Sequence, residues 1–479
     1  MKPFYITTTL PYVNAEPHIG FAMEIIRADI IARSKKAAGH DVFFNTGTDE
    51  HGIKIYRKAK EQNIEPQEYC DKMALKFKAI LPALGIMPEI NFIRTTDPHH
   101  VAAAQEFWKL VDKNGYIYKK NYSVKYCVGC ELEKTDSELV NGRCPLHPLT
   151  ELEIIQEENY FFKWSAFQQK LLDLYAERPD FVIPDFRFNE IKAFVERGLE
   201  DFSISRIKSK MPWGIPVPGD EDQVMYVWFD ALVDYISAIG WPDDEVQGKN
   251  EKGAFKKWWM ETGGVVQYCG KDNLRQQSAM WQAMLMAAGL EPSRQIVING
   301  FVTGEGGIKM SKSLGNTVDP LEIVKEYGTD ALRYYVAREL SPFEDSPFTK
   351  EKFKETFNAG LANGIGNLTS RVLKMVVDNG VKIEFKPVKP IAIDGYNIKA
   401  ACDEIWKLIQ EADKSIQDQQ PFKVVKTDPE KGKEMIATLG GQLYTIAQLL
   451  EPIIPETAAK IQEHLRENKM PAAPLFARR

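Results

Sequence analysis

The sequence predicts an α/β fold in which a doubly wound parallel sheet is interrupted by a small inserted domain and followed by a bundle of helices. Strand-like and helix-like segments alternate near the N-terminus and again before residue 300. Cysteines and turn residues break this alternation after Gly115, and past Phe353 apolar residues recur at helical spacing with few glycines or prolines. A chain of 479 residues has room for about three such domains.

The N-terminal segment shows the order strand, loop, helix, strand. KPFYITTTL reads as a buried strand and PYVNAEPHIG as a loop, and apolar residues recur at helical spacing from Phe21 to Ala38. Gly39 is a typical helix stop, and DVFFN follows as a second short strand. PHIG and TGTDEHG (46–52) therefore fall beyond the carboxyl ends of strands, where doubly wound sheets bind ligands.

The middle of the chain predicts an insertion. Turn residues and short strand-like pieces surround the cysteines after Gly115, and VMYVWFDALVDYISAIGW with QYCGKDN then restores the α/β rhythm. We therefore predict a first α/β half at 1–114, an insertion at 115–220, a second α/β half at 221–300, a loop segment at 301–352 and a helical domain at 353–479.

Composition excludes several classes of protein. Hydrophobic and charged contents of 44% and 27% are typical of a globular chain rather than a disordered or fibrous one. The N-terminus lacks a leader pattern, and no apolar run reaches the roughly 18 residues of a membrane span. We expect a cytoplasmic protein. A net charge of -6 argues against nonspecific polyanion binding by the whole surface. The same net charge is compatible with a local basic groove that binds nucleic acid.

The cysteines indicate a metal site. Cys127-x2-Cys130 and Cys144-x2-His147 are two short ligand pairs, as tetrahedral zinc requires. The alternative is a set of reduced cysteines in a turn-rich domain, and the paired spacing favours zinc. Four protein ligands fill the coordination sphere, so the predicted role is structural. The scattered cysteines are expected to be buried apolar residues: Cys70, Cys269 and Cys402.

Two further motifs suit a phosphate ligand. PHIG places His18 before a helix start, although alone it is compatible with an ordinary loop histidine. GIKMSKSLGN carries Lys309 and Lys312 on a loop preceded by several glycines. Ammonium groups on such a loop can contact a triphosphate when its charge shifts during a reaction. The segment lacks the order of a Walker A loop.

Together, HIG and KMSKS with α/β patterns around them resemble the signatures of class I aminoacyl-tRNA synthetases. A longer series is similar to the methionyl-tRNA synthetases in sequence and order from residue 5 to about residue 461: LPYVNAEPHIG, TGTDEHG, EENYFFKWS, DFSISR, WGIPVP, YVWFDALVDYISA, GKDN, KMSKSLGN, GNLTSR and LLEPIIPETAAKI. The resemblance implies a Rossmann-type catalytic domain that activates methionine with ATP and magnesium. Pyrophosphate is released, and the methionyl group passes to tRNA(Met).

The resemblance also assigns residues to the two small substrates. It places Leu10, Tyr12, Trp228 and Tyr235 around the methionine side chain, where aromatic rings suit a polarizable thioether. Asp49 would receive the substrate ammonium. Taken alone, each aromatic residue would more often be an ordinary core residue.

For ATP, the resemblance implies that His18 and Gly20 approach the phosphates from the helix start and that Gly270 and Asp272 border the ribose. Lys309 and Lys312 would stabilise the transition state and the leaving pyrophosphate.

In the helical domain, the resemblance implies that Asn367 and Arg371 bond base edges of the CAU anticodon and that Phe422 stacks on a base. The family usually has tryptophan in place of Phe422. Without the flanking GNLTSR, Asn367 and Arg371 would be read as a solvated helix pair. The cysteine cluster resembles the zinc knuckle in the connective insertion of these synthetases.

Two positions depart from the family pattern. Phe21 stands where the signature generally has its second histidine, and Gln277 stands where the methionine pocket usually presents a histidine. We expect Phe21 to pack near adenine or ribose, with backbone N–H groups making the polar contacts. The alternative is a noncatalytic tRNA-binding paralogue.

The remaining site residues favour an active methionine–tRNA ligase. The isoleucyl, valyl and leucyl enzymes carry an editing insertion too large for residues 115–220. We expect a monomer, because no appended oligonucleotide-binding module follows the bundle.

Overall fold

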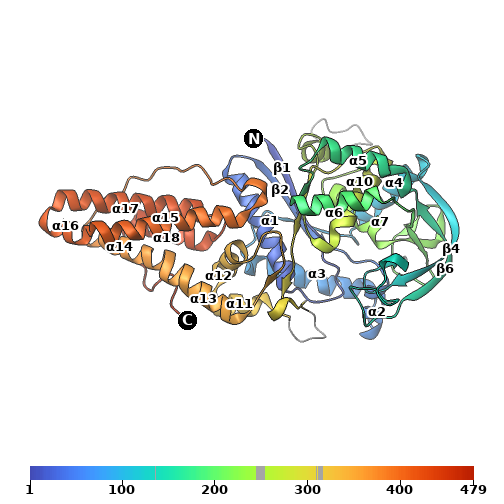
Figure 1. Cartoon of the computed structure of the whole chain (residues 1–479), viewed down its shortest axis with the longest axis horizontal. Helices are drawn as coiled ribbons and strands as arrows, with labels where there is room; N and C mark the ends of the chain where they lie inside the picture. Colours follow the sequence, from blue (N-terminus) through green and yellow to red (C-terminus); the bar gives the residue numbers. More distant parts are fainter. Residues whose placement is uncertain (135, 244–253, 309, 311–316) are drawn as a thin grey trace.

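The computed structural model describes residues 1–134, 136–243, 254–308, 310 and 317–479. The molecule is elongated (Figure 1): a helical bundle extends from one end, a strand-rich insertion forms the other end, and the N-terminal strands lie between them. Among the described helices, none combines the length and the apolar character needed to cross a membrane.

A six-stranded parallel sheet forms the centre of the fold, which confirms the predicted α/β class. Its order is β3, β2, β1, β12, β13, β7, so the chain moves outward in one direction from β1 to β3 and in the other from β12 to β13, while the earlier strand β7 completes that edge. The point between β1 and β12 is therefore the topological switch point, where doubly wound sheets form their crevice. The strands, in chain order, span Pro3–Thr8, Asp41–Thr48, Asn91–Arg94, Val182–Ile183, Val266–Gly270 and Gln295–Asn299.

Helix α1 (Ile19–Ala37) is the central helix of the core. It begins earlier than the apolar spacing predicted, because the side chain of His18 caps its first turn. Both faces are buried, since α1 packs on the sheet and on the C-terminal helices. The other helices of the α/β region are α2 (Ile53–Glu61), α3 (Pro66–Ala83), α4 (Pro98–Lys113), α7 (Val227–Ala231), α8 (Asp234–Ser237) and α10 (Trp281–Ala288).

The insertion contains two small antiparallel sheets. Strands β4 (Ile117–Cys127) and β6 (Glu153–Phe162) form a long ribbon flanked by β5 (Leu132–Lys134) and β8 (Phe202–Ser203). The second sheet holds β9 (Ser205–Ile207), β10 (Pro216–Val217) and β11 (Asp220–Met225). Between β6 and β8 the chain forms α5 (Gln168–Glu177), β7 and α6 (Asp185–Glu196), and β7 pairs with β13. The range 115–220 thus also completes one edge of the central sheet.

The C-terminal region is helical, as predicted. Strands β14 (Val302–Thr303) and β15 (Ser346–Pro347) form a short pair that encloses α11 (Pro320–Tyr327) and α12 (Thr329–Tyr334) in the sequence, and a π-helical segment at Phe357–Gly366 leads into the bundle. The other helices are α13 (Lys350–Thr356), α14 (Asn367–Asp378), α15 (Ile398–Gln419), α16 (Pro421–Thr427), α17 (Pro429–Leu450) and α18 (Pro455–Glu467).

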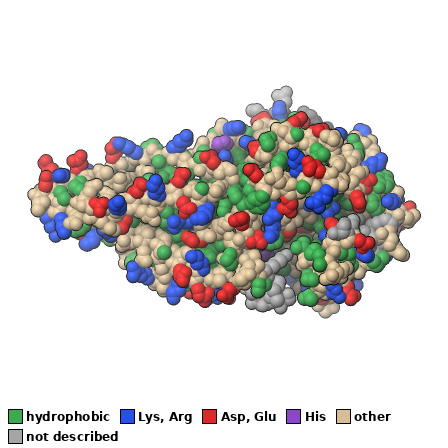
Figure 2. All heavy atoms as spheres, in the orientation of Figure 1, with side chains coloured by type: hydrophobic (Ala, Val, Ile, Leu, Met, Phe, Trp, Pro, Cys, Tyr) green, Lys and Arg blue, Asp and Glu red, His purple; other side chains and the backbone are tan. Residues whose placement is uncertain are grey.

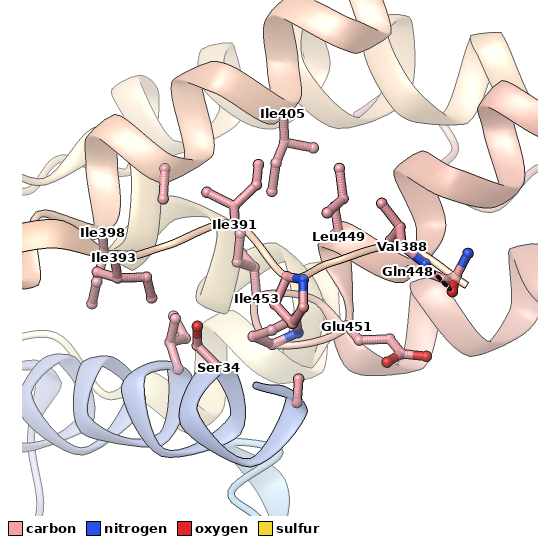
Figure 3. A pocket seen from close by; sticks show the side chains of 15 residues that line it. Ser34, Val388, Ile391, Ile393, Ile398, Ile405, Gln448, Leu449, Glu451 and Ile453 are labelled. Atoms are coloured by element: carbon pink, nitrogen blue, oxygen red, sulfur yellow. Dashed lines mark hydrogen bonds between the residues drawn. The ribbon is translucent and has the colours of Figure 1, made fainter. Parts of the chain in front are cut away.

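A buried ion pair joins the bundle to the α/β region. Arg333 of α12 is fully buried and donates to Asp29 of α1 at 2.7 Å. The same guanidinium donates to the carbonyls of Pro452 and Ile453 between α17 and α18. Next to this junction lies a cavity of about 210 Å³ with Ser34, Ile391, Ile405 and Leu449 in its wall (Figure 3). Most of the residues that line the cavity are apolar, and none of the predicted site residues is among them.

Candidate active site

The segments that carry the predicted site residues follow neighbouring parallel strands. Residues 9–13 follow β1, residues 49–52 follow β2, residues 271–273 follow β12, and the glycine-containing loop 304–307 lies shortly after β13. Because the carboxyl ends of parallel strands share one edge of a sheet, these segments converge on the switch point. The polar residues of this edge therefore surround the crevice where a nucleotide would lie.

Backbone hydrogen bonds align the first two segments. The N–H of Asp49 donates to Pro11 at 3.0 Å, and the N–H of Val13 donates to the carbonyl of Asp49 at 3.1 Å. Leu10 is buried and Tyr12 is half-buried. The structure thus places Leu10, Tyr12 and Asp49 side by side.

Asp49 is a buried carboxylate whose environment favours a cationic partner. Burial, followed by the charges of Asp230 and Glu131, raises its pKa well above the usual value. One of its carboxylate oxygens has no hydrogen-bond partner among the described residues. A cationic group beside Asp49 would satisfy that oxygen and stabilise the ionised form.

A second buried carboxylate lies near Asp49. Asp230 of α7 is bonded to His51 at 2.7 Å and to His100 at 2.8 Å. Burial alone would raise its pKa, but the two histidines hold the pKa of Asp230 below the usual value. The pKa values of these two neighbouring carboxylates are therefore shifted in opposite directions, upward for Asp49 and downward for Asp230. Sequence reasoning missed Asp230 and its histidines, because no periodic pattern joins them.

Helices α7 and α8 carry Trp228 and Tyr235, the other two aromatic residues predicted for the methionine pocket. Trp228 packs with Tyr12 around a small buried cluster, and Tyr235 is 2% exposed. The amide of Gln277 donates to the hydroxyl of Tyr235 at 2.7 Å. Burial, followed by the charge of Asp234, raises the pKa of Tyr235 well above the usual value, so the phenol stays neutral.

A chain of buried hydrogen bonds fixes the direction of that contact. The backbone N–H of Ser293 donates to Gln282 at 2.9 Å, and Gln282 donates to the hydroxyl of Ser293 at 3.2 Å. That hydroxyl donates to Gln267 at 2.7 Å, and Gln267 donates to Gln277. Because a backbone N–H can only donate, every later bond in the chain has one direction. Tyr235 is therefore an acceptor toward Gln277, and its own hydrogen is free to point elsewhere.

His18 and Gly20 form a unit at the start of α1. The N–H of Gly20 donates to Nδ1 of His18 at 3.0 Å. A Cβ at residue 20 would lie 2.8 Å from the imidazole ring, so glycine is required for this ring position. Phe21 is half-buried and packs edge-on against Phe77 of α3, with 5.2 Å between ring centroids. The sequence predicted a ring near the nucleotide and did not anticipate this neighbour.

The end of β12 brings Gly270 and Asp272 to the crevice. A Cβ at residue 270 would lie 2.8 Å from the carboxylate of Asp272, so glycine allows the close approach. Glu24 of α1 lies beside them and accepts from the N–H of Thr9 at 2.9 Å. Burial raises the pKa of Glu24 to about 8, and Asp272 adds to the shift. Sequence reasoning missed Glu24, although its position one helical turn beyond Gly20 was a usable signal.

The two lysines of the glycine-preceded loop, Lys309 and Lys312, lie outside the described residues. Their predicted role stays a prediction.

The four predicted metal ligands come together in the insertion. One ligand atom from each of Cys127, Cys130, Cys144 and His147 lies within 4.8 Å of the others. Sγ of Cys130 is 3.4 Å from Sγ of Cys144 and 3.2 Å from Nδ1 of His147. Tetrahedral zinc with bonds of about 2.3 Å places neighbouring sulfurs about 3.8 Å apart, so the donor set fits a metal ion. Gly129 allows this, since a Cβ there would lie 2.4 Å from the imidazole.

The predicted anticodon residues lie far from this crevice. Asn367 is exposed at the start of α14, and Arg371, one turn later, pairs with Asp413 of α15. Phe422 is 41% exposed on α16, at the distal tip of the bundle (Figure 1). Basic and acidic side chains alternate over the bundle in the view of Figure 2.

A family model described as tRNA synthetases class I (M) matches residues 4–152 and 149–373. A methionine–tRNA ligase from Synechocystis is 40% identical, with 96% of this chain and 89% of that protein aligned. The corresponding protein of Thermosynechococcus vestitus is 41% identical over 97% of this chain and 90% of its own length.

Solved structures agree with this relationship. The Mycobacterium tuberculosis methionyl-tRNA synthetase in complex with methionyl-adenylate superposes with a TM-score of 0.88 at 36% identity, covering 96% of this chain and 93% of that one. The apo form of that synthetase gives a TM-score of 0.82 at 31% identity, covering 100% of this chain and 98% of the synthetase chain. The chain therefore belongs to the methionine–tRNA ligase family of class I tRNA synthetases.

Proposed function

We propose that this protein is a methionine–tRNA ligase, which activates methionine with ATP to methionyl-adenylate and transfers the methionyl group to tRNA(Met). The observation that carries the proposal is the near full-length relation to methionine–tRNA ligases at about 40% identity. The convergence of the predicted residues at one sheet edge supports it.

In the first step, a carboxylate oxygen of methionine attacks the α-phosphorus of ATP and pyrophosphate leaves. Asp49 would hold the ammonium of methionine and so orient its carboxylate, because its free oxygen and raised pKa favour a cationic partner. Leu10, Tyr12, Trp228 and Tyr235 would enclose the thioether side chain, with Gln277 fixing the hydroxyl of Tyr235.

For ATP, the helix start at His18 and Gly20 would face the phosphates, where backbone N–H groups and the positive end of α1 favour anions. Gly270 and Asp272 would border the ribose, and Phe21 would support the helix start. Lys309 and Lys312 would stabilise the leaving pyrophosphate, and magnesium would enter with ATP. In the second step, a hydroxyl at the 3′ end of the tRNA attacks the activated carbonyl and AMP leaves.

The cysteine cluster would hold one structural zinc ion, because four protein ligands leave no open position for chemistry. Purified protein should contain one zinc per chain. Cys144→Ser should lower the metal content. It should also make the insertion more sensitive to limited proteolysis than the bundle. Fully active protein that contains no metal would contradict this assignment.

Asn367, Arg371 and Phe422 would read the CAU anticodon of the tRNA. Their location on the bundle supports this role, since a bound tRNA must span from its 3′ end at the crevice to the anticodon at the distal helices.

The direct test is ATP–pyrophosphate exchange with each of the standard amino acids. Methionine should support exchange, and the others should not. If no amino acid supports exchange while the protein still binds tRNA, the protein is a noncatalytic tRNA-binding paralogue.

A further inference from the structure

The Cys-x2-Cys turn of the insertion lies directly against the residues proposed for the methionine pocket. Val128, inside the turn, packs with Tyr12 and Trp228 around buried Tyr226 and Val227. The metal-binding turn and the substrate pocket are therefore in contact, although more than a hundred residues separate Tyr12 from Val128 in the sequence.

Glu131, the residue after Cys130, makes the most specific of these contacts. Its side chain is buried, with 4% of the residue exposed, and its carboxylate accepts a hydrogen bond from the hydroxyl of Tyr12 at 2.8 Å. Its carbonyl accepts from the hydroxyl of Tyr226. Its backbone has a φ of 50°, which is uncommon for a residue other than glycine. The chain thus uses a disfavoured conformation to aim this carboxylate at Tyr12.

Two neighbours from α2 and its N-terminus enclose the contact. Lys54 donates to the carbonyl of Gly129 at 2.6 Å and lies 5.4 Å from the ring centroid of Tyr12. A Cβ at Gly52 would lie 2.6 Å from the Tyr12 hydroxyl and 3.0 Å from the Glu131 carboxylate. A side chain at residue 52 would therefore collide with the Tyr12–Glu131 pair, and both Glu131 and Lys54 contact Tyr12.

We propose that Glu131 is a positioning residue for the methionine pocket and that the Cys-x2-Cys turn forms one wall of it. The inference rests on the proposed function. Glu131 would not touch the reacting atoms. It would hold Tyr12 in the orientation that closes on the methionine side chain, so its loss should weaken methionine binding without a matching effect on ATP.

The test compares Glu131→Ala, Glu131→Gln and Tyr12→Phe. It measures the KM of methionine and ATP in pyrophosphate exchange, the Kd of methionine by calorimetry, and the metal content. Glu131→Ala should raise the KM and Kd of methionine about tenfold, while the KM of ATP changes less than about threefold and the metal content stays the same. Glutamine keeps an acceptor oxygen, so Glu131→Gln should recover most of the affinity.

Glu153→Gln is the matched control, because Glu153 lies in the same insertion, is half exposed and pairs with exposed Arg57. Tyr12→Phe removes only the hydroxyl, so it should lower methionine affinity as much as Glu131→Ala does. The double variant should show no further loss of methionine affinity. Tyr12→Phe protein with wild-type methionine affinity, or additive losses in the double variant, would overturn the inference. A wild-type protein that neither binds methionine nor exchanges pyrophosphate would instead overturn the proposed function.

Discussion

Replacing Gln277 with leucine should weaken both the fold and methionine recognition. Gln277 is 1% exposed, and its amide uses both ends: it accepts from Gln267 and donates to Tyr235 at 2.7 Å. Leucine is of similar size, so Gln277→Leu removes the two hydrogen bonds without leaving a large cavity. It leaves a buried amide donor on Gln267 and a buried oxygen on Tyr235 without those partners.

The size of the effect follows from these two groups. Each buried polar group left unsatisfied costs about 1–3 kcal/mol, which gives about 2–6 kcal/mol for the pair. Gln267 also hydrogen-bonds Tyr235, so the two orphaned groups can partly satisfy each other. We therefore expect the free energy of unfolding to fall by about 2–3 kcal/mol. Loss of the fixed hydroxyl direction should also raise the KM of methionine about tenfold.

Urea unfolding and pyrophosphate exchange measure the two effects on the same protein. Gln277→His is the matched variant, because an imidazole can still donate to Tyr235, and it should keep the KM of methionine within about threefold of wild type. The reasoning is refuted if Gln277→Leu leaves both the unfolding free energy and the KM of methionine unchanged. It is also refuted if the KM of ATP rises as much as that of methionine.

Three other changes probe separate parts of the account. Arg371→Ala should weaken tRNA charging and reduce discrimination against altered anticodons by about 1–3 kcal/mol, while tRNA-independent pyrophosphate exchange stays near normal. Loss of both charging and exchange would instead show that the substitution destabilises the bundle. Phe21→His should change the rate of pyrophosphate exchange by less than about tenfold. Phe21→Ala removes the contact with Phe77, so it should raise the KM of ATP more than Phe21→His does, and an equal KM of ATP in the two variants would contradict this. Burial raises the pKa of Glu24 from 4.5 to about 8, so the stability from its protonated form is full below pH 4.5 and is lost as pH rises through 8. Thermal unfolding should therefore depend less on pH between 4.5 and 8 in Glu24→Gln than in wild type, and identical pH profiles would contradict the shift.

The sequence predicted the parallel sheet and the helical C-terminal region well, because both rest on local periodicity. Apolar runs bounded by glycine and proline marked β1 and β2, and helical spacing marked α14, α15 and α17. The start of α1 was placed late, because a histidine cap is not among the usual cap residues. The short helix α16 falls within the predicted helical range, but its seven residues carry too little period to be recognised as a separate helix.

Contacts between distant side chains were beyond the reach of the sequence. The Asp29–Arg333 pair, the Tyr12–Glu131 bond and the Asp230 network each join residues from separate elements. No spacing rule predicts such pairs, because their geometry depends on how the elements pack. The spacing of the cysteines and His147 did predict a cluster, since short ligand pairs fix their own local geometry.

The central claim is most directly tested by aminoacylation with labelled methionine. The wild-type protein, with ATP and magnesium, should attach methionine to a tRNA bearing the CAU anticodon and release AMP in equal amount. The same tRNA with its anticodon changed should be charged far less. No methionyl-tRNA from the CAU-bearing transcript, under conditions where the protein is folded and binds methionine, would contradict the account.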